Sequence, residues 1–302
     1  MAFEVSVIIP VFNREKFIER AIMSAVTLEC VKEIIVIDDG STDSSFSICQ
    51  QLSSIYPKIR VLSHPGHKNK GVSVSRNLGI ASAKSAYIAF LDSDDYYLEN
   101  RFDFEKELYK TKPMFDGVYG ASEWVWVEQS KKELYTIKSH TEPSELFKAL
   151  LWQNKGLFDT NTITIRKTLL DRIGYFDEYM PVAEDTELWY RTAAYGNIYT
   201  GNIYEPIAVR IIHSNNAVIN LADKYNHYYK YMYKKMLKHY LFSRHISFNN
   251  KNEILLMLNN YQKLFDKVYP EKEFVAKLMR HYPFLWFCPF IYKLFFKIAV
   301  SR

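Results

Sequence analysis

The 302-residue sequence contains few cysteines and glycines, and their spacing argues against several kinds of site. The three cysteines, Cys30, Cys49 and Cys288, form no C-x-x-C pair, so neither a disulfide framework nor a zinc site is indicated. No G-x-G-x-x-G motif follows the first predicted strand, which disfavours a dinucleotide-binding dehydrogenase. Residues 66–73 have the glycine spacing of a P-loop, but Val72 stands where a P-loop has its lysine.

A secretory leader and a clear membrane span are also not evident. The first ten residues, MAFEVSVIIP, carry a glutamate and no basic flank, so we expect no signal peptide and a reduced, cytoplasmic setting. Residues 284–300 are strongly apolar, but they span only 17 positions and include Pro289, Lys293 and Lys297. Because the two lysines share one helical face, the segment predicts peripheral contact with an anionic membrane, at the inner face of the cell membrane. Packing of this helix on the main domain or on a partner protein is the alternative.

Charge is distributed unevenly along the chain, whose formal net charge is +5. Residues 221–302 contain 15 Lys and Arg against 5 Asp and Glu, whereas residues 1–220 contain 24 against 29. We therefore expect a domain boundary near residue 220, followed by a basic, aromatic-rich helical extension. No nucleic-acid-binding motif accompanies the basic segment, so nucleic acid is not expected as a partner.

Apolar, β-branched stretches alternate with helical patterns in the first part of the chain. Strands are predicted at 5–12, 33–38, 59–63 and 87–92, with helices at 14–28 and 71–83. Further strands are predicted at 116–127 and 161–167, with helices at 143–153 and 184–196. This alternation predicts an α/β fold with a mostly parallel sheet flanked by helices.

Polar clusters follow three of the predicted strands, where ligands of parallel sheets bind. Asn13 follows the first strand, Asp38-Asp39 the second and Asp92–Asp95 the fourth. Asp92 and Asp94 of the last cluster form a D-x-D pair, whose like charges favour a divalent cation that also binds a diphosphate. A solvated acidic turn and a helix cap are the alternatives for the last two clusters.

Five motifs together resemble glycosyltransferase family 2. They are VSVIIPVFN (5–13), IIVIDDGSTD (34–43), GVSVSRNLGI (71–80), FLDSDD (90–95) and EDTELWYR (184–191). The resemblance implies a GT-A fold over residues 1–220, with a nucleotide-binding part up to about residue 112 and an acceptor part over about 113–220. It also implies inverting, metal-dependent sugar transfer from a nucleotide diphosphate-sugar, here a UDP-sugar, with Mn²⁺ or Mg²⁺.

The resemblance assigns roles on the donor side. Pro10, Val11 and Asn13 are expected to line the nucleotide pocket. Asp39 is expected to accept a hydrogen bond from the base, and Arg76 to contact the nucleotide portion of the donor.

The same resemblance assigns the D-x-D stretch. Asp92 is expected to face the ribose or the metal, Ser93 to contact the nucleotide-sugar, and Asp94 to bind the metal directly. Asp95 extends this cluster. His213, which follows a strand-like run, is expected near the metal or the diphosphate; a structural histidine is the alternative.

Asp185 occupies the family's position for the general base, and Glu184 is a further member of that site. The alternative is that both are acidic residues favoured in the first turn of a helix. The implied acceptor is a glycan or a lipid-linked glycan, as in the biosynthesis of polysaccharides or lipooligosaccharides. An inactive nucleotide-sugar or polysaccharide binder on the same fold remains an alternative. A nucleotidyltransferase is less consistent, because its glycine- and lysine-rich loop is missing.

Overall fold

The computed structural model describes residues 2–152, 155–213 and 225–240, together with a few single positions between 243 and 254. The chain divides into two compact units, Met1–Ala222 and Asp223–Arg302. The first unit carries every residue that the sequence assigns to a site.

The strands are β1 (Val5–Val11), β2 (Val31–Asp38), β3 (Ile59–Ser63), β4 (Tyr87–Phe90), β5 (Tyr96–Tyr97), β6 (Gly117–Tyr119), β7 (Ala121–Trp126), β8 (Lys131–Tyr135), β9 (Ile163–Arg166), β10 (Ile198–Thr200) and β11 (Pro206–Ile212). The α-helices are α1 (Ile18–Val26), α2 (Ser45–Ile55), α3 (Val72–Ser82), α4 (Asp103–Thr111), α5 (Pro143–Trp152), α6 (Lys167–Ile173), α7 (Glu184–Tyr195) and α9 (Tyr225–Tyr240). Two short 3₁₀ helices are η1 (Pro65–His67) and η2 (Thr160–Thr162).

Seven strands form the main sheet in the order β10-β6-β9-β4-β1-β2-β3. All neighbours are parallel except β9, which runs antiparallel to both β4 and β6. The predicted mostly parallel sheet is therefore confirmed. Because β9 runs the opposite way, its first residues lie at the same edge as the carboxyl ends of β1, β2 and β4.

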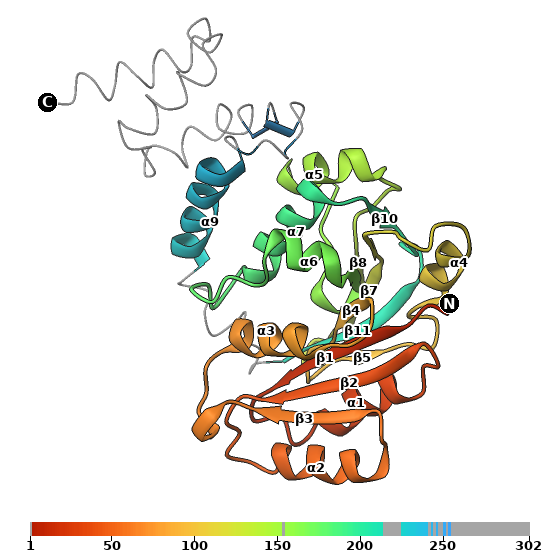
Figure 1. The fold of residues 1–302 in the computed structure, drawn as a ribbon, viewed down its shortest axis with the longest axis vertical. Helices are drawn as coiled ribbons and strands as arrows, with labels where there is room; N and C mark the ends of the chain where they lie inside the picture. The colour runs from red at the N-terminus through yellow and green to blue at the C-terminus, as the bar shows by residue number, and fades with distance from the viewer. Residues whose placement is uncertain are drawn as a thin grey trace, which may run out of the picture. The chain divides into compact units, whose positions relative to one another are not determined.

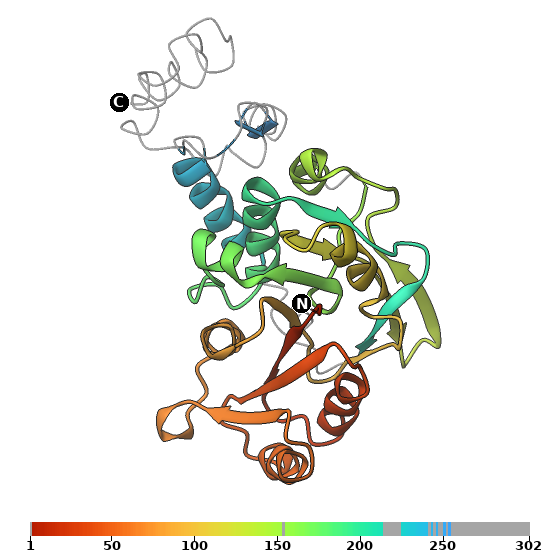
Figure 2. The ribbon, with the colours of Figure 1, turned by 45° about the vertical axis from the view of Figure 1, so that its right-hand side comes forward.

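Helices cover both faces of this sheet, as Figures 1 and 2 show. Helices α1 and α2 pack on one face and α3 on the other. All seven residues of β1 are buried, which explains its continuous apolar sequence. Helix α3 approaches closely at Gly79, where a Cβ atom would lie 2.5 Å from a methyl group of Ile8.

A second sheet has the strand order β5-β11-β7-β8. The prediction of a single strand over 116–127 is wrong, because this segment forms two strands, β6 and β7, that belong to different sheets. The break falls at Gly120, where a Cβ atom would lie 2.6 Å from Ile207 and 2.9 Å from the carbonyl oxygen of Asn202. The strand predicted over 161–167 also begins later, because η2 precedes β9.

The second unit contains α9, which agrees with the helical pattern of its sequence. Within the described residues, no helix combines the length and apolar character needed to cross a membrane. Residues 284–300 lie outside the described part of the chain, so their expected membrane contact stays a prediction.

Candidate active site

The structure gathers the polar clusters at one edge of the main sheet, beyond the ends of β1, β2 and β4. Pro10 and Val11 are buried in β1, where they pair with Ile37 and Asp38 of β2. Asn13 follows with a left-handed backbone (φ 52°) and its side-chain oxygen accepts a hydrogen bond from Thr42 N at 2.8 Å. This part of the edge is therefore formed by two loops that brace each other.

Asp39 holds a neighbouring loop in place. Its Oδ1 accepts the backbone N–H of Lys70 at 2.7 Å and its Oδ2 accepts that of Gly71 at 2.9 Å. Asp39 is 4% exposed, and Gly71 has φ 93°, a conformation that favours glycine. Asp39 thus has a clear structural role, and its expected contact with the base stays a prediction.

Asn161, on η2 just before β9, holds the D-x-D loop in place. Its Oδ1 accepts the N–H of Asp92 at 2.8 Å, and its Nδ2 donates to Asp95 Oδ2 at 2.8 Å. Ser93, between them, is buried. The antiparallel strand β9 thereby fixes the loop that follows β4.

Asp95 faces inward. It is 1% exposed, and its Oδ1 accepts the N–H of Ile211 on β11 at 2.7 Å. Burial, followed by the charge of Asp94, raises the pKa of Asp95 well above its ordinary value. Because Ile211 lies two residues before His213, Asp95 ties the D-x-D loop to the strand that carries His213.

Asp94 and His213 lie side by side at the rim of this site, where 12% of the Asp94 side chain and 15% of the His213 side chain are exposed. Asp94 Oδ2 and His213 Nε2 are 3.3 Å apart, and the His213 ring stacks on Phe17 with centroids 5.3 Å apart. Arg14 Nε donates to the same Asp94 oxygen at 3.1 Å. Burial raises the pKa of Asp94, but the hydrogen bond with His213 and the charge of Arg14 together bring it below its ordinary value.

Arg76 connects the D-x-D loop to α7. Its Nη2 donates to Asp92 Oδ1 at 2.7 Å, and its Nη1 donates to Glu184 Oε1 at 2.7 Å. Arg76 is 4% exposed. Burial, followed by the charge of Asp185, raises the pKa of Glu184 to about 7, although Arg76 opposes the rise. Arg76 therefore joins two carboxylates that the sequence separates widely.

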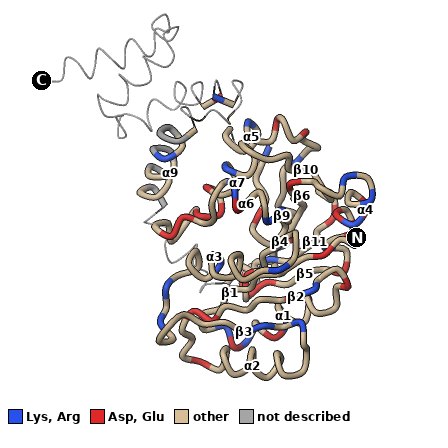
Figure 3. The backbone as a smooth tube through the Cα atoms, viewed as in Figure 1, with Lys and Arg blue, Asp and Glu red and all other residues tan. Residues whose placement is uncertain are grey.

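Asp185 lies next to Glu184 in the first turn of α7. The residue before this helix, Ala183, has a left-handed backbone (φ 59°), which is strained for a residue with a Cβ atom. Asp185 Oδ1 accepts the N–H of Thr186 at 2.5 Å, and Asp185 Oδ2 lies 3.4 Å from Thr160 Oγ1 on η2. Figure 3 shows the acidic positions of this first turn and of the preceding loop in red.

The ligand atoms of Asp94 and His213 fit a divalent cation that a substrate would also bind. Across residues 2–152, 155–213 and 225–240, no three His, Cys, Asp or Glu side chains are grouped to hold a metal ion. Asp94 and His213 supply two donor atoms at the rim, and Mg²⁺ commonly takes one or two carboxylates plus substrate phosphates. Asp92 is engaged by Arg76 instead, so its expected role as a metal ligand stays a prediction.

Several residues of this region were not foreseen from the sequence. They are Arg14, Asp159, Thr160, Asn161 and Arg210. Asp159 is buried, and Ser122 and Trp124 donate to its carboxylate. For Asp159, Thr160 and Asn161, the sequence signal is the polar run D-T-N before β9, and it points to the site only once β9 is known to be antiparallel.

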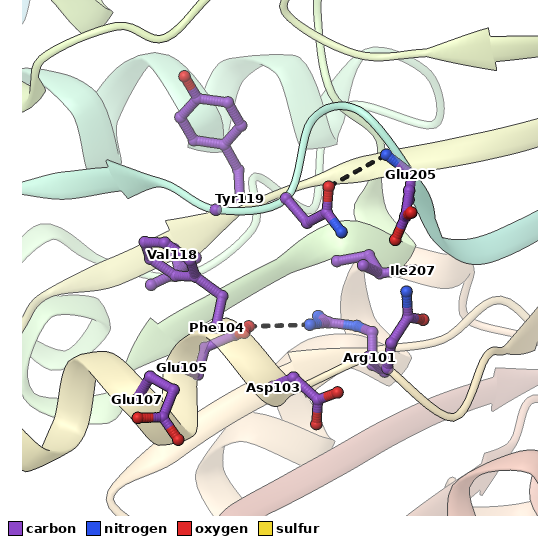
Figure 4. Close-up of a pocket in the computed structure, with 12 residues that line it drawn as sticks. Arg101, Asp103, Phe104, Glu105, Glu107, Val118, Tyr119, Glu205 and Ile207 are labelled. Carbon is purple, nitrogen blue, oxygen red and sulfur yellow. Dashed lines mark hydrogen bonds and ion pairs between the residues drawn. The ribbon is translucent and has the colours of Figure 1, made fainter.

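A cavity of about 420 Å³ lies elsewhere, between α4, β6 and the start of β11 (Figure 4). Phe104, Val118 and Ile207 supply apolar lining, and none of the predicted site residues lines it. Its buried ion pair is internal, since Arg101 Nη1 donates to Glu105 Oε1 at 2.9 Å. We assign no role to this cavity.

Comparison with known proteins agrees with this arrangement. The family described as Glycosyl transferase family 2 matches residues 6–175. An uncharacterized glycosyltransferase of Rickettsia felis is 30% identical over 228 residues, which are 74% of this chain and 35% of that protein. Chondroitin synthase of Pasteurella multocida is 32% identical over 145 residues, 44% of this chain and 15% of that protein. This chain therefore spans about a third, or less, of the length of these relatives.

A solved structure shares the fold. TarS residues 1–349 of S. aureus, in complex with UDP-GlcNAc, has a TM-score of 0.66 and 18% identity, over 92% of this chain and 81% of that chain. The sheet, its flanking helices and this likeness define a GT-A fold of the glycosyltransferase type. The match over residues 6–175 then gives the family: this chain belongs to glycosyl transferase family 2.

Proposed function

We propose that this protein is an inverting glycosyltransferase that moves a hexose or N-acetylhexosamine from a UDP-sugar to a hydroxyl group of a glycan or lipid-linked acceptor. The observation that carries the proposal is the buried bridge Asp92–Arg76–Glu184. It connects the D-x-D loop to the turn that carries Asp185, so the residues expected to bind the donor and to remove a proton belong to one structural unit.

Asp185 is proposed as the general base. In the transfer step, an acceptor oxygen forms a bond to the anomeric carbon, the bond from that carbon to the diphosphate breaks, and Asp185 takes the proton of the hydroxyl group. The contacts of Asp185 Oδ1 with Thr186 and of Oδ2 with Thr160 hold its carboxylate in one orientation. Ala183, in its strained conformation, sets the start of α7 at this point.

Asp94 and His213 are proposed to hold Mn²⁺ or Mg²⁺, with Asp92 nearby on the same loop. When bound, the cation would offset the charge that develops on the leaving UDP. The chain's own residues orient these groups: Asn161 and Asp95 fix the loop, and Phe17 stacks on His213.

The donor is proposed from the fold and the acceptor from a relative. TarS was solved with UDP-GlcNAc, so this nucleotide sugar is the first to test. The similarity to a chondroitin synthase favours a glycan acceptor. A lipid-linked glycan is consistent with the basic and apolar segment 284–300, and liposome flotation of the full chain with Lys293→Glu and Lys297→Glu would test that contact.

A panel of nucleotide sugars tests the function directly. We expect UDP-sugars with Mn²⁺ to raise the melting temperature, and one of them to be hydrolysed slowly to UDP. Asp94→Ala should abolish the hydrolysis while leaving the fold intact by circular dichroism. Stabilisation by no nucleotide sugar, with or without cation, would contradict the proposed function. Stabilisation by a nucleotide sugar without hydrolysis or transfer would favour the inactive alternative.

A further inference from the structure

Arg14 donates a hydrogen bond to the Asp94 oxygen that a cation would bind. Its Nε donates to Asp94 Oδ2 at 3.1 Å, and the same oxygen lies 3.3 Å from His213 Nε2. The side chains are only partly exposed, 22% for Arg14 and 12% for Asp94. A positive charge is therefore already in place where the proposed cation site would form.

The backbone of Arg14 is fixed although its side chain reaches the rim. Arg14 N donates to Ser45 Oγ at 2.7 Å, and the next residue, Glu15, donates its N–H to Asp43 Oδ2 at 3.1 Å. The guanidinium is also held locally, because Nη1 donates to the carbonyl oxygen of Asn13 at 3.0 Å. The bond from Nε to Asp94 Oδ2 has to break for the guanidinium to leave the carboxylate.

A divalent cation on Asp94 Oδ2 would lie close to the Arg14 guanidinium. Ligand oxygens lie about 2.0–2.2 Å from Mg²⁺ or a similar ion, which would place its charge within a few ångströms of Arg14. The repulsion between the two positive groups favours movement of Arg14 away from the carboxylate. A planar guanidinium matches two phosphate oxygens at once, so a diphosphate beside Asp94 offers Arg14 a second partner.

We propose that Arg14 holds Asp94 while the site is free of cation, and that it transfers to the diphosphate of the donor when a divalent cation binds. This inference rests on the proposed function. It assigns two opposite effects to one side chain: Arg14 competes with the cation alone, and it assists binding of the nucleotide together with the cation.

The opposite signs make the proposal testable with Arg14→Gln. Mn²⁺ binding is measured as the decrease in the electron paramagnetic resonance signal of free Mn²⁺, first with no nucleotide present. Removal of a partly exposed ion pair should tighten Mn²⁺ binding by about 3- to 10-fold. Binding of UDP, measured by calorimetry at saturating Mn²⁺, should weaken by roughly 10-fold, the scale of one charge-assisted hydrogen bond.

Two further variants serve as controls. Arg20 also approaches Asp94, but its Nη2 donates to the backbone oxygen at 2.9 Å and its guanidinium lies over Tyr96. Arg20→Gln removes the same charge nearby and should change Mn²⁺ affinity by less than about 3-fold. Arg14→Lys keeps the positive charge, so its Mn²⁺ affinity should lie between those of the wild type and Arg14→Gln.

The outcomes distinguish a failure of the exchange, in which Arg14 moves from Asp94 to the diphosphate, from a failure of the proposed function. Tighter Mn²⁺ binding together with weaker UDP binding in Arg14→Gln supports the exchange. Unchanged or weaker Mn²⁺ binding in a folded Arg14→Gln variant overturns it, because a purely structural role would weaken both ligands. If neither the wild type nor Arg14→Gln binds Mn²⁺, with or without UDP, the cation site of the proposed function fails and the exchange fails with it.

Discussion

The donor side and the base side of the site are held by different kinds of hydrogen bond. On the donor side, buried carboxylates accept backbone N–H groups: Asp38 binds those of Gly40 and Ser41, and Asp39 those of Lys70 and Gly71. On the base side, contacts between side chains are more prominent, as in the Arg76–Glu184 ion pair, although Asp185 also accepts the N–H of the next residue, Thr186. The donor-side carboxylates order the backbone of loops, whereas the Asp185 carboxylate contacts its neighbour and the side chain of Thr160.

This difference teaches where to look for effects on stability and where to look for effects on rate. Substitutions on the donor side should lower the free energy of unfolding. Substitution of Asp185 or of its partner Thr160 on the base side should lower turnover while the fold persists. The predictions below test that division, beginning with the largest effect.

Asp185→Asn should lower the transfer rate by roughly 10²-fold or more, the scale of a lost general base. The amide keeps an oxygen that can accept from Thr186, so the first turn of α7 should remain in place. Initial rates with a UDP-sugar and its acceptor, alongside UDP affinity and the melting temperature, measure this. A wild-type rate would show that another residue is the base. A large fall in melting temperature would show that Asp185 has a structural role.

Asp39→Asn should lower the free energy of unfolding by about 2 kcal/mol, because an amide NH₂ would face one of the two backbone N–H groups that the carboxylate now accepts. Urea unfolding measures the change. Asp43→Asn is the matched control: Asp43 also accepts two backbone N–H groups, from Glu15 and Ser45, but it is more exposed and water can replace them. Equal losses in the two variants would contradict the special role of burial at Asp39.

The sheet edge that carries the site was predictable from the sequence, and the limits of that prediction have physical causes. The strands β1, β2 and β4 are largely buried, so each contains an apolar run, and the polar residues after them mark the edge of the sheet. The direction of β9 leaves no such mark, because the pattern of buried residues is the same in either direction. Thr160 and Asn161 were missed for this reason.

The aspartates of the D-x-D loop show a second limit of prediction from the sequence. Asp92, Asp94 and Asp95 look alike in sequence, yet Asp92 pairs with Arg76, Asp94 lies at the rim and Asp95 is buried against β11. The partner of Asp95, Ile211, is 116 residues away. Local sequence carries no information about a contact at that separation, so only the fold distinguishes the three carboxylates.

The stability of the protein should decrease as the pH rises through the titration of Glu184. Burial and the charge of Asp185 raise the pKa of Glu184 from its ordinary 4.5 to about 7. The folded protein keeps this proton to a higher pH than the unfolded chain does. The stability linked to it is therefore fully present below pH 4.5 and is lost as the pH passes through about 7.

Glu184→Gln isolates this effect because glutamine does not titrate. Between pH 5 and pH 8 the wild type should lose about 1–2 kcal/mol more of its unfolding free energy than this variant. Urea unfolding at several pH values gives the difference. Glu178→Gln, on the loop before α7 and exposed, should follow the pH dependence of the wild type. Parallel pH profiles for the wild type and Glu184→Gln would place the Glu184 titration outside this range.

Thr160→Val should produce the smallest effect, and it tests whether the base side depends on single side-chain contacts. Thr160 Oγ1 lies 3.4 Å from Asp185 Oδ2, a long hydrogen bond, so its loss should cost about 1 kcal/mol, or roughly a 5-fold fall in kcat. The KM for the donor should not change, because Thr160 contacts the base and not the D-x-D loop. Thr160→Ser keeps the hydroxyl group and should restore kcat. Thr160 is 3% exposed, and valine preserves its packing. If the unfolding free energy fell by more than the activation free energy for turnover rose, Thr160 would serve the fold, as the donor-side carboxylates do.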